Sequence, residues 1–131
     1  MEINKIEETI KNLTEVFFEA GKLSIELRNK GLTESFKKDK TPVTNGDIEV
    51  NNVIISSLKK ITPKIPIVSE EAIENKNLNL DTFWLVDPID GTYDYINNRD
   101  EFTLNAGLII NKKAAAGIIY APAKNRMFYS Y

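Results

Sequence analysis

The sequence predicts an α+β domain in which two N-terminal helices pack on a mostly antiparallel β-sheet. Three observations indicate this class: an amphipathic helical period at the N-terminus, a second helical segment with its own capping residues, and a series of apolar strands in the C-terminal third. The helices precede the strands instead of alternating with them, so βαβ units are not expected. The chain has 131 residues, of which 42% are hydrophobic, and this length fits one domain, residues 1–131.

The first helix is expected from Ile3 to about Leu27. Apolar side chains recur there at alternating steps of three and four residues, which places them on one face of a helix. Gly31 predicts the end of this helix, because glycine readily adopts the backbone conformation that closes a helix. The basic residues Arg28 and Lys30 precede it, as is typical of a last helical turn.

A second helix is expected from about Thr44 to about Ile61. Thr44 and Asp47 have the spacing of a capping box, with Asp in place of the usual Glu. In such a box each side chain accepts a hydrogen bond from the other residue's backbone N–H, so Asp47 has a structural explanation that needs no substrate. Pro63 and Pro66 mark the exit from the helix.

The remainder of the chain is expected to form strands joined by turns. The polar segment 72–81 predicts a surface loop, and the last three strands predict an antiparallel meander. Trp84, Phe102 and Phe128 lie in apolar runs and are expected in the core. The expected strands are residues 67–69, 83–86, 102–110, 114–121 and 126–131.

Composition excludes several kinds of chemistry. The sequence contains no cysteine and no histidine, so thiolate zinc sites, imidazole acid–base chemistry and Ser-His or Cys-His nucleophiles are excluded. Seventeen basic residues oppose nineteen acidic ones, and a formal charge of -2 gives no overall attraction to nucleic acid or to an anionic membrane. No apolar stretch reaches the ~20 residues needed to span a bilayer. A cytoplasmic protein is therefore expected.

Two carboxylates three residues apart follow the apolar run 83–86. Asp87 and Asp90 would emerge at the end of a strand, and Gly91 allows the backbone to turn sharply after them. An ionised carboxylate in a core is costly unless it is paired, hydrogen-bonded or bound to a metal. The motif therefore predicts its own counter-ion, although Asp-Pro and Asp-Gly are also ordinary turn sequences.

Glu70 adds a third carboxylate just beyond the expected strand 67–69. If that strand and the one leading to Asp87 are neighbours, Glu70, Asp87 and Asp90 meet at one edge of the sheet. Mg²⁺ prefers oxygen ligands of this kind, and the carbonyl of Ile89 could provide another. By itself, Glu70 would more often belong to a solvated loop pair with Glu71.

A phosphate site is expected next to the metal site. Thr92 follows Gly91 and can begin a helical turn whose free N–H groups would face a bound phosphate. Cations at such a site can lower the pKa of a water that attacks phosphorus and can stabilise the leaving oxygen, so no protein nucleophile is required. Lys37 and Lys38 are taken as surface residues and are not assigned to the site.

Another phosphatase class, the haloacid-dehalogenase type, has to be considered, because a strand there leads to a nucleophilic aspartate. That chemistry places its second Asp two residues after the first, whereas Asp87 and Asp90 are three apart. The chain also lacks the βαβ alternation of that class. This assignment is therefore disfavoured.

Three ordered motifs resemble the inositol monophosphatase superfamily. They are PVTNGD at residues 42–47, VSEE at residues 68–71 and WLVDPIDGT at residues 84–92. Within the superfamily, residues 41–44 and EFTLN at residues 101–105 are more similar to 3'(2'),5'-bisphosphate nucleotidases of the CysQ type. The resemblance covers about residues 37–131. Tyr93 departs from it, since the nucleotidase branch usually has Lys after Gly-Thr.

The resemblance implies a Mg²⁺-dependent phosphatase that converts adenosine 3',5'-bisphosphate to AMP and phosphate, with inositol phosphates as alternative substrates. It implies two roles for residues that act on the phosphate: Asp47 and Thr92 orient and deprotonate the attacking water, and the Gly91 and Thr92 amides hold the phosphate. The implied metal ligands are Glu70, Asp87, the Ile89 carbonyl and Asp90.

Members of the superfamily continue into a C-terminal domain that supplies another aspartate ligand and much of the substrate pocket. The sequence ends at Tyr131, so we expect it to correspond to the N-terminal domain alone. A third hypothesis, a non-catalytic fragment that associates with other chains, follows from the surface that the second domain would cover. A homo-oligomer is expected on these grounds.

Overall fold

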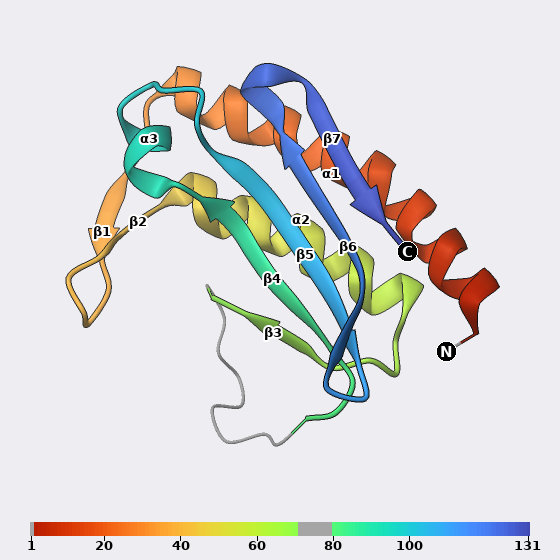
Figure 1. Ribbon diagram of the computed structural model, residues 1–131. Helices are drawn as coiled ribbons and strands as arrows, with labels where there is room; N and C mark the ends of the chain where they lie inside the picture. Colours follow the sequence, from red (N-terminus) through yellow and green to blue (C-terminus); the bar gives the residue numbers. More distant parts are fainter. Residues whose placement is uncertain (1, 71–79) are drawn as a thin grey trace.

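The computed structural model describes residues 2–70 and 80–131 (Figure 1). Helices α1 (Ile3–Lys30) and α2 (Asn45–Ile61) lie side by side against one face of a five-stranded sheet. Both helices occupy the predicted segments, and Gly31 follows α1 as its C-cap residue. The α+β class expected from the sequence is confirmed.

The sheet is antiparallel except at one edge. Its strands are ordered β3-β4-β5-β6-β7; β3 pairs with β4 in parallel, and the other neighbours are antiparallel. The meander β5-β6-β7 confirms the sequence prediction, and the short 3₁₀ helix η1 (Pro122–Lys124) joins its last two strands. The strands are β3 (Ile67–Ser69), β4 (Phe83–Asp90), β5 (Thr103–Ile110), β6 (Lys113–Ala121) and β7 (Arg126–Ser130).

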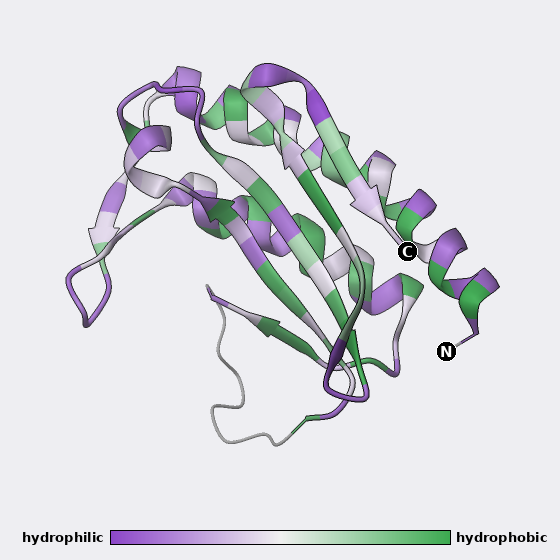
Figure 2. Ribbon diagram, viewed as in Figure 1, coloured by the Kyte–Doolittle hydropathy of each residue, from purple (hydrophilic) through white to green (hydrophobic). Residues whose placement is uncertain are grey.

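Two features of the strands differ from the expectation. Strand β4 does not end at Val86 but continues to Asp90, with an irregular register between Asp87 and Asp90. In addition, β1 (Glu34–Phe36) and β2 (Pro42–Thr44) form an antiparallel hairpin that the sequence pattern did not predict. Neither strand alternates between buried and exposed positions, so no period of two marks them in the sequence, and the hydrophilic tip of this hairpin extends away from the sheet (Figure 2).

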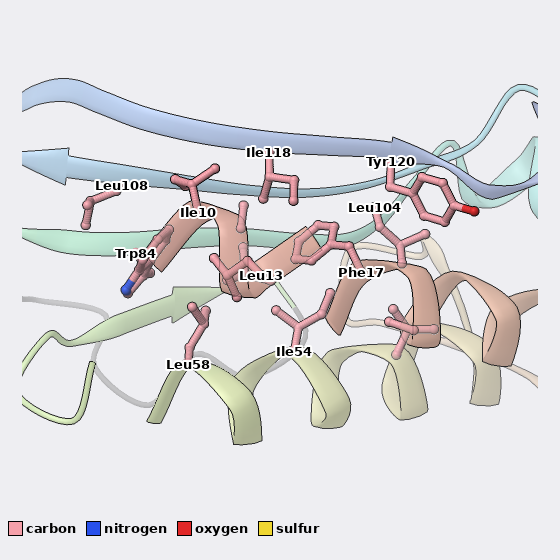
Figure 3. Packing of buried hydrophobic residues seen from close by; sticks show 14 of the residues in the cluster. Ile10, Leu13, Phe17, Ile54, Leu58, Trp84, Leu104, Leu108, Ile118 and Tyr120 are labelled. Carbon is pink, nitrogen blue, oxygen red and sulfur yellow. The ribbon is translucent and has the colours of Figure 1, made fainter. Parts of the chain in front are cut away.

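The core lies between the helices and the inner face of the sheet. Figure 3 shows Ile10, Leu13 and Phe17 of α1 packed among side chains from α2 and the central strands. Trp84 and Phe102 are fully buried, as expected. Phe128 was wrongly expected in the core: it is 59% exposed, because its position on β7 faces away from the helices.

Part of the predicted polar loop, and Glu71, lie outside the described residues. Only Leu80 and Asp81 of segment 72–81 are described; Leu80 is partly buried and Asp81 is exposed. Within the part of the chain that is described, no helix is long and apolar enough to cross a membrane.

Candidate active site

Asp47 is completely buried at the start of α2, where it closes a capping box. Its Oδ2 accepts hydrogen bonds from the backbone N–H of Thr44 at 2.9 Å and from the Thr44 hydroxyl at 2.6 Å. The Thr44 hydroxyl in turn accepts from the backbone N–H of Asp47 at 3.2 Å. The capping box predicted from the sequence is confirmed, and these bonds use one of the two carboxylate oxygens.

The other carboxylate oxygen of Asp47 contacts Thr92, the last residue of the motif at residues 84–92. Asp47 Oδ1 accepts a hydrogen bond from Thr92 Oγ1 at 3.1 Å, between residues 45 positions apart in the sequence. The Thr92 hydroxyl also lies 3.4 Å from the carbonyl oxygen of Ile89. A hydroxyl has one proton, so the shorter contact takes it and directs the oxygen lone pairs elsewhere. Capping and contact with Thr92 are therefore simultaneous roles of one side chain.

Gly91 makes the turn that brings Thr92 to Asp47. Its backbone is left-handed, with φ 87° and ψ 45°, and it is the N-cap residue of the short helix α3 (Thr92–Ile96). A Cβ at this position would lie 2.8 Å from the carbonyl oxygen of Glu101. Both the conformation and the space require glycine. The helical turn expected after Gly91 is thus present.

The register of β3 and β4 places two of the expected metal ligands side by side. Ser69 pairs with Val86, and the backbone N–H of Glu70 donates to the Val86 carbonyl at 3.2 Å, so Glu70 comes next to Asp87. Both Ser69 and Val86 face the helices and are buried. Because side chains alternate along a strand, Asp87 belongs to the opposite, outer face of the sheet, whereas Glu70 lies in the turn just after β3 and is exposed.

The expected ligands do not already form a cluster. Within residues 2–70 and 80–131, no three acidic side chains lie close enough together to hold a metal ion. Asp90 is exposed, whereas Ile89 is buried and presents its carbonyl oxygen near Thr92. The donor chemistry still fits Mg²⁺, because every available donor is a carboxylate or carbonyl oxygen.

Asn105 lies in this region, although the sequence pattern did not predict it as a site residue. From the neighbouring strand β5, its Nδ2 lies 3.4 Å from the Asp87 carbonyl and donates to the carbonyl and hydroxyl of Thr103 at 3.2 and 3.1 Å. The carboxamide therefore holds the backbone of β4 where the register becomes irregular. Asp87 pairs with Asn105 across β4 and β5, and this register depends on the tertiary structure, so no local sequence pattern predicts it.

Helix α3 is anchored to α1 by Tyr95 and Arg28. The Tyr95 hydroxyl donates to the carbonyl of Ser24 at 2.6 Å, and burial, followed by the negative charge of Asp47, raises the pKa of Tyr95. The Arg28 guanidinium stacks 5.0 Å from the Phe102 ring and 5.7 Å from the Tyr95 ring, and its Nη1 donates to the Arg99 carbonyl. These contacts fix the turn that carries Thr92.

Comparisons with known proteins agree on one family. The inositol monophosphatase family profile matches residues 5–131. The 3'(2'),5'-bisphosphate nucleotidase CysQ of Buchnera aphidicola subsp. Acyrthosiphon pisum is 42% identical over 107 residues, which are 79% of this chain and 40% of that protein. The chain thus spans less than half the length of this relative.

Solved structures share the fold. A Thermotoga maritima IMPase superposes with a TM-score of 0.82 at 26% identity over 94% of this chain and 48% of its own. An IMPase/NADP phosphatase complexed with Mg²⁺ and phosphate superposes with a TM-score of 0.79 over 97% of this chain and 48% of its own. At 17% identity, the second likeness concerns the fold alone.

Proposed function

The chain belongs to the inositol monophosphatase family, and we propose that the full-length protein is a Mg²⁺-dependent phosphomonoester hydrolase. The proposed substrates are 3'(2'),5'-bisphosphate nucleotides such as adenosine 3',5'-bisphosphate, because the CysQ relatives with that name are 42% identical over most of this chain. Inositol monophosphates are the alternative, supported by the likeness to the Thermotoga maritima IMPase.

The observation that carries this proposal is the hydrogen bond from Thr92 Oγ1 to Asp47 Oδ1. It directs the Thr92 proton toward a buried carboxylate and leaves the Thr92 oxygen free to accept a hydrogen bond from a water. As that water attacks phosphorus, its proton passes to Thr92 Oγ1 while the Thr92 proton passes to Asp47. The pair acts as a general base that needs no histidine, in agreement with the composition.

Glu70, Asp87, Asp90 and the Ile89 carbonyl are the proposed ligands of Mg²⁺. When bound, the cation supplies Lewis-acid polarisation of the phosphate and lowers the pKa of the attacking water. The position of Glu70, just after β3, beside Asp87 of β4 supports this assignment. The Gly91 and Thr92 amides are proposed to bind the phosphate, since N–H groups at the start of a helical turn have no acceptor within it.

Phosphate release by the full-length protein tests the proposal. Adenosine 3',5'-bisphosphate and inositol 1-phosphate are each assayed with Mg²⁺ and with excess chelator. We expect release that requires Mg²⁺ and a higher kcat/KM for the nucleotide. The reverse order of substrates would select the inositol alternative, and hydrolysis of neither would reject the phosphatase assignment.

A second candidate, association of residues 1–131 with other chains, is favoured by the outer face of the sheet. Leu85, Ile119 and Phe128 are exposed there, around an open hollow of about 400 Å³ whose lining also includes Asp87 and Asn105. Apolar side chains gathered on one face favour association with a covering surface. We propose that this segment, taken alone, forms homo-oligomers through this face.

A further inference from the structure

Asn51 and Ser69 join α2 to the end of β3 by a buried hydrogen bond. Ser69 Oγ donates to Asn51 Oδ1 at 2.5 Å, and the two residues are 1% and 3% exposed. Asn51 lies about one helical turn after Asp47, and Ser69 immediately precedes Glu70. The bond therefore connects helix α2, which carries the proposed base, with the strand that leads directly to a proposed metal ligand.

Strand β3 has a short pairing with the rest of the sheet. It is three residues long and lies at the edge of the sheet, where β4 is its only neighbour among the described strands. An edge strand of this length is held by few backbone hydrogen bonds. A side-chain bond formed away from water gains strength from the low local dielectric. The bond to Asn51 therefore adds to the local order at the point where Glu70 leaves the strand.

We propose that Asn51 is a positioning residue for the metal site: through Ser69 it fixes the main chain of Glu70 beside Asp87. The inference rests on the proposed function, because Glu70 is a metal ligand only there. Residues that orient ligands through hydrogen bonds influence metal affinity although they do not touch the ion. Asn51 acts in this way from the helix that also carries Asp47.

A second buried bond between α2 and the sheet provides a matched control. Trp84 Nε1 donates to Thr62 Oγ1 at 2.9 Å, at the C-terminal end of α2. Trp84 precedes Asp87 by three positions on β4, or about 10 Å along a strand. If Asn51 only held α2 against the sheet, loss of the Thr62 bond would have the same effect on metal binding.

The test compares Asn51→Ala, Ser69→Ala, the double variant and Thr62→Val in the full-length protein. Binding of Mn²⁺, a probe that also favours oxygen ligands, is measured from the electron paramagnetic resonance of the free ion. Exchange of the Glu70 amide hydrogen is followed in metal-free protein. We expect about tenfold weaker Mn²⁺ binding in each single variant, no further loss in the double variant, and no change in Thr62→Val. Glu70 exchange accelerates in the same variants.

Three results would overturn the inference: unchanged Mn²⁺ affinity in Asn51→Ala and Ser69→Ala, additive losses in the double variant, or an equal loss in Thr62→Val. Absence of Mn²⁺ binding by the unmodified protein would overturn the proposed metal site instead. In that case the exchange rate of the Glu70 amide hydrogen tests the positioning role of Asn51. Faster exchange confined to the Asn51 and Ser69 variants supports this role, and unchanged exchange rejects it. Ser69→Ala keeps the test valid if Asn51→Ala does not fold.

Discussion

The hydroxyl of Tyr95 donates a 2.6 Å hydrogen bond to the backbone carbonyl of Ser24, across 71 positions of sequence. Tyr95 is fully buried and belongs to the turn that follows Gly91, whereas Ser24 belongs to α1. A Cβ on Gly46 would lie 2.2 Å from the same hydroxyl oxygen. Three helices therefore meet at this hydroxyl: α1, α3 and the first turn of α2. The first turn of α2 also carries Asp47, part of the proposed base.

Tyr95→Phe is expected to lower the free energy of unfolding by about 1 to 3 kcal/mol, because the buried Ser24 carbonyl loses its donor. Urea unfolding measures the change. Tyr93→Phe is the control, since Tyr93 is 65% exposed and lies two residues away. Equal stabilities of the Tyr95→Phe variant and the unmodified protein would show that the bond contributes nothing.

Stability is expected to fall as the pH rises above about 10, in part through Tyr95. Burial raises the pKa of Tyr95 in the folded protein, while the unfolded side chain ionises near the ordinary value of about 10. The contribution of the neutral phenol is therefore complete below pH ~10 and is lost at higher pH, where only the unfolded state releases the proton. Unfolding free energies measured from pH 8 to 11 should decline less steeply for Tyr95→Phe than for Tyr93→Phe.

Gly91→Ala should destabilise the protein by about 2 kcal/mol and impair hydrolysis. The left-handed backbone costs a residue with a Cβ about 1 to 2 kcal/mol, and the new atom would press against the Glu101 carbonyl. Gly31→Ala is a useful comparison, because φ there is also positive, at 100°, but nothing lies within 4 Å of the added Cβ. A loss of kcat in both variants would argue against a local effect on Thr92.

Thr92→Val should lower kcat about 100-fold or more with little change in stability, because the hydroxyl of the proposed general base is removed. Thr92→Ser retains the hydroxyl and should retain most of the activity. Steady-state kinetics of phosphate release with saturating Mg²⁺ measure both. Activity of Thr92→Val near that of the unmodified protein would reject the proposed role.

Thr44→Ala separates the two roles of Asp47. It removes the hydroxyl of the capping box and should cost about 1 kcal/mol of stability. Asp47→Asn alters the oxygen that accepts from Thr92 as well, so it should reduce kcat far more than Thr44→Ala. Thermal unfolding and kinetics on the same preparations make the comparison. Equal losses of kcat would indicate that Asp47 acts only as a cap.

Residues 1–131 produced alone should form dimers or larger species. Phe128→Ser and Ile119→Thr should shift them toward monomers, because both side chains lie on the exposed outer face of the sheet. Phe36→Ser is the control, since Phe36 is 69% exposed on the separate β1-β2 hairpin. Light scattering measures the masses, and a monomeric unmodified segment would contradict the expectation.

Local sequence determined the helices, the meander and the capping box. Each of these features depends on neighbours within a few residues, so the sequence pattern alone predicts it. They are the apolar periodicity of α1, the spacing of Thr44 and Asp47, and the apolar strand segments after Glu101. The motifs around Asp47, Glu70 and Asp87 also identified the family, which the match over residues 5–131 confirms.

Tertiary structure decided which atoms meet. Strand register, and the face that a strand presents to the helices, determine three features of the protein. These are the contact of Thr92 with Asp47, the pairing of Asp87 with Asn105 and the exposure of Phe128. The Asn51–Ser69 bond likewise joins residues that are ordinary in their own segments. Such relationships arise when distant elements pack together, and no local periodicity encodes the distance between their side chains.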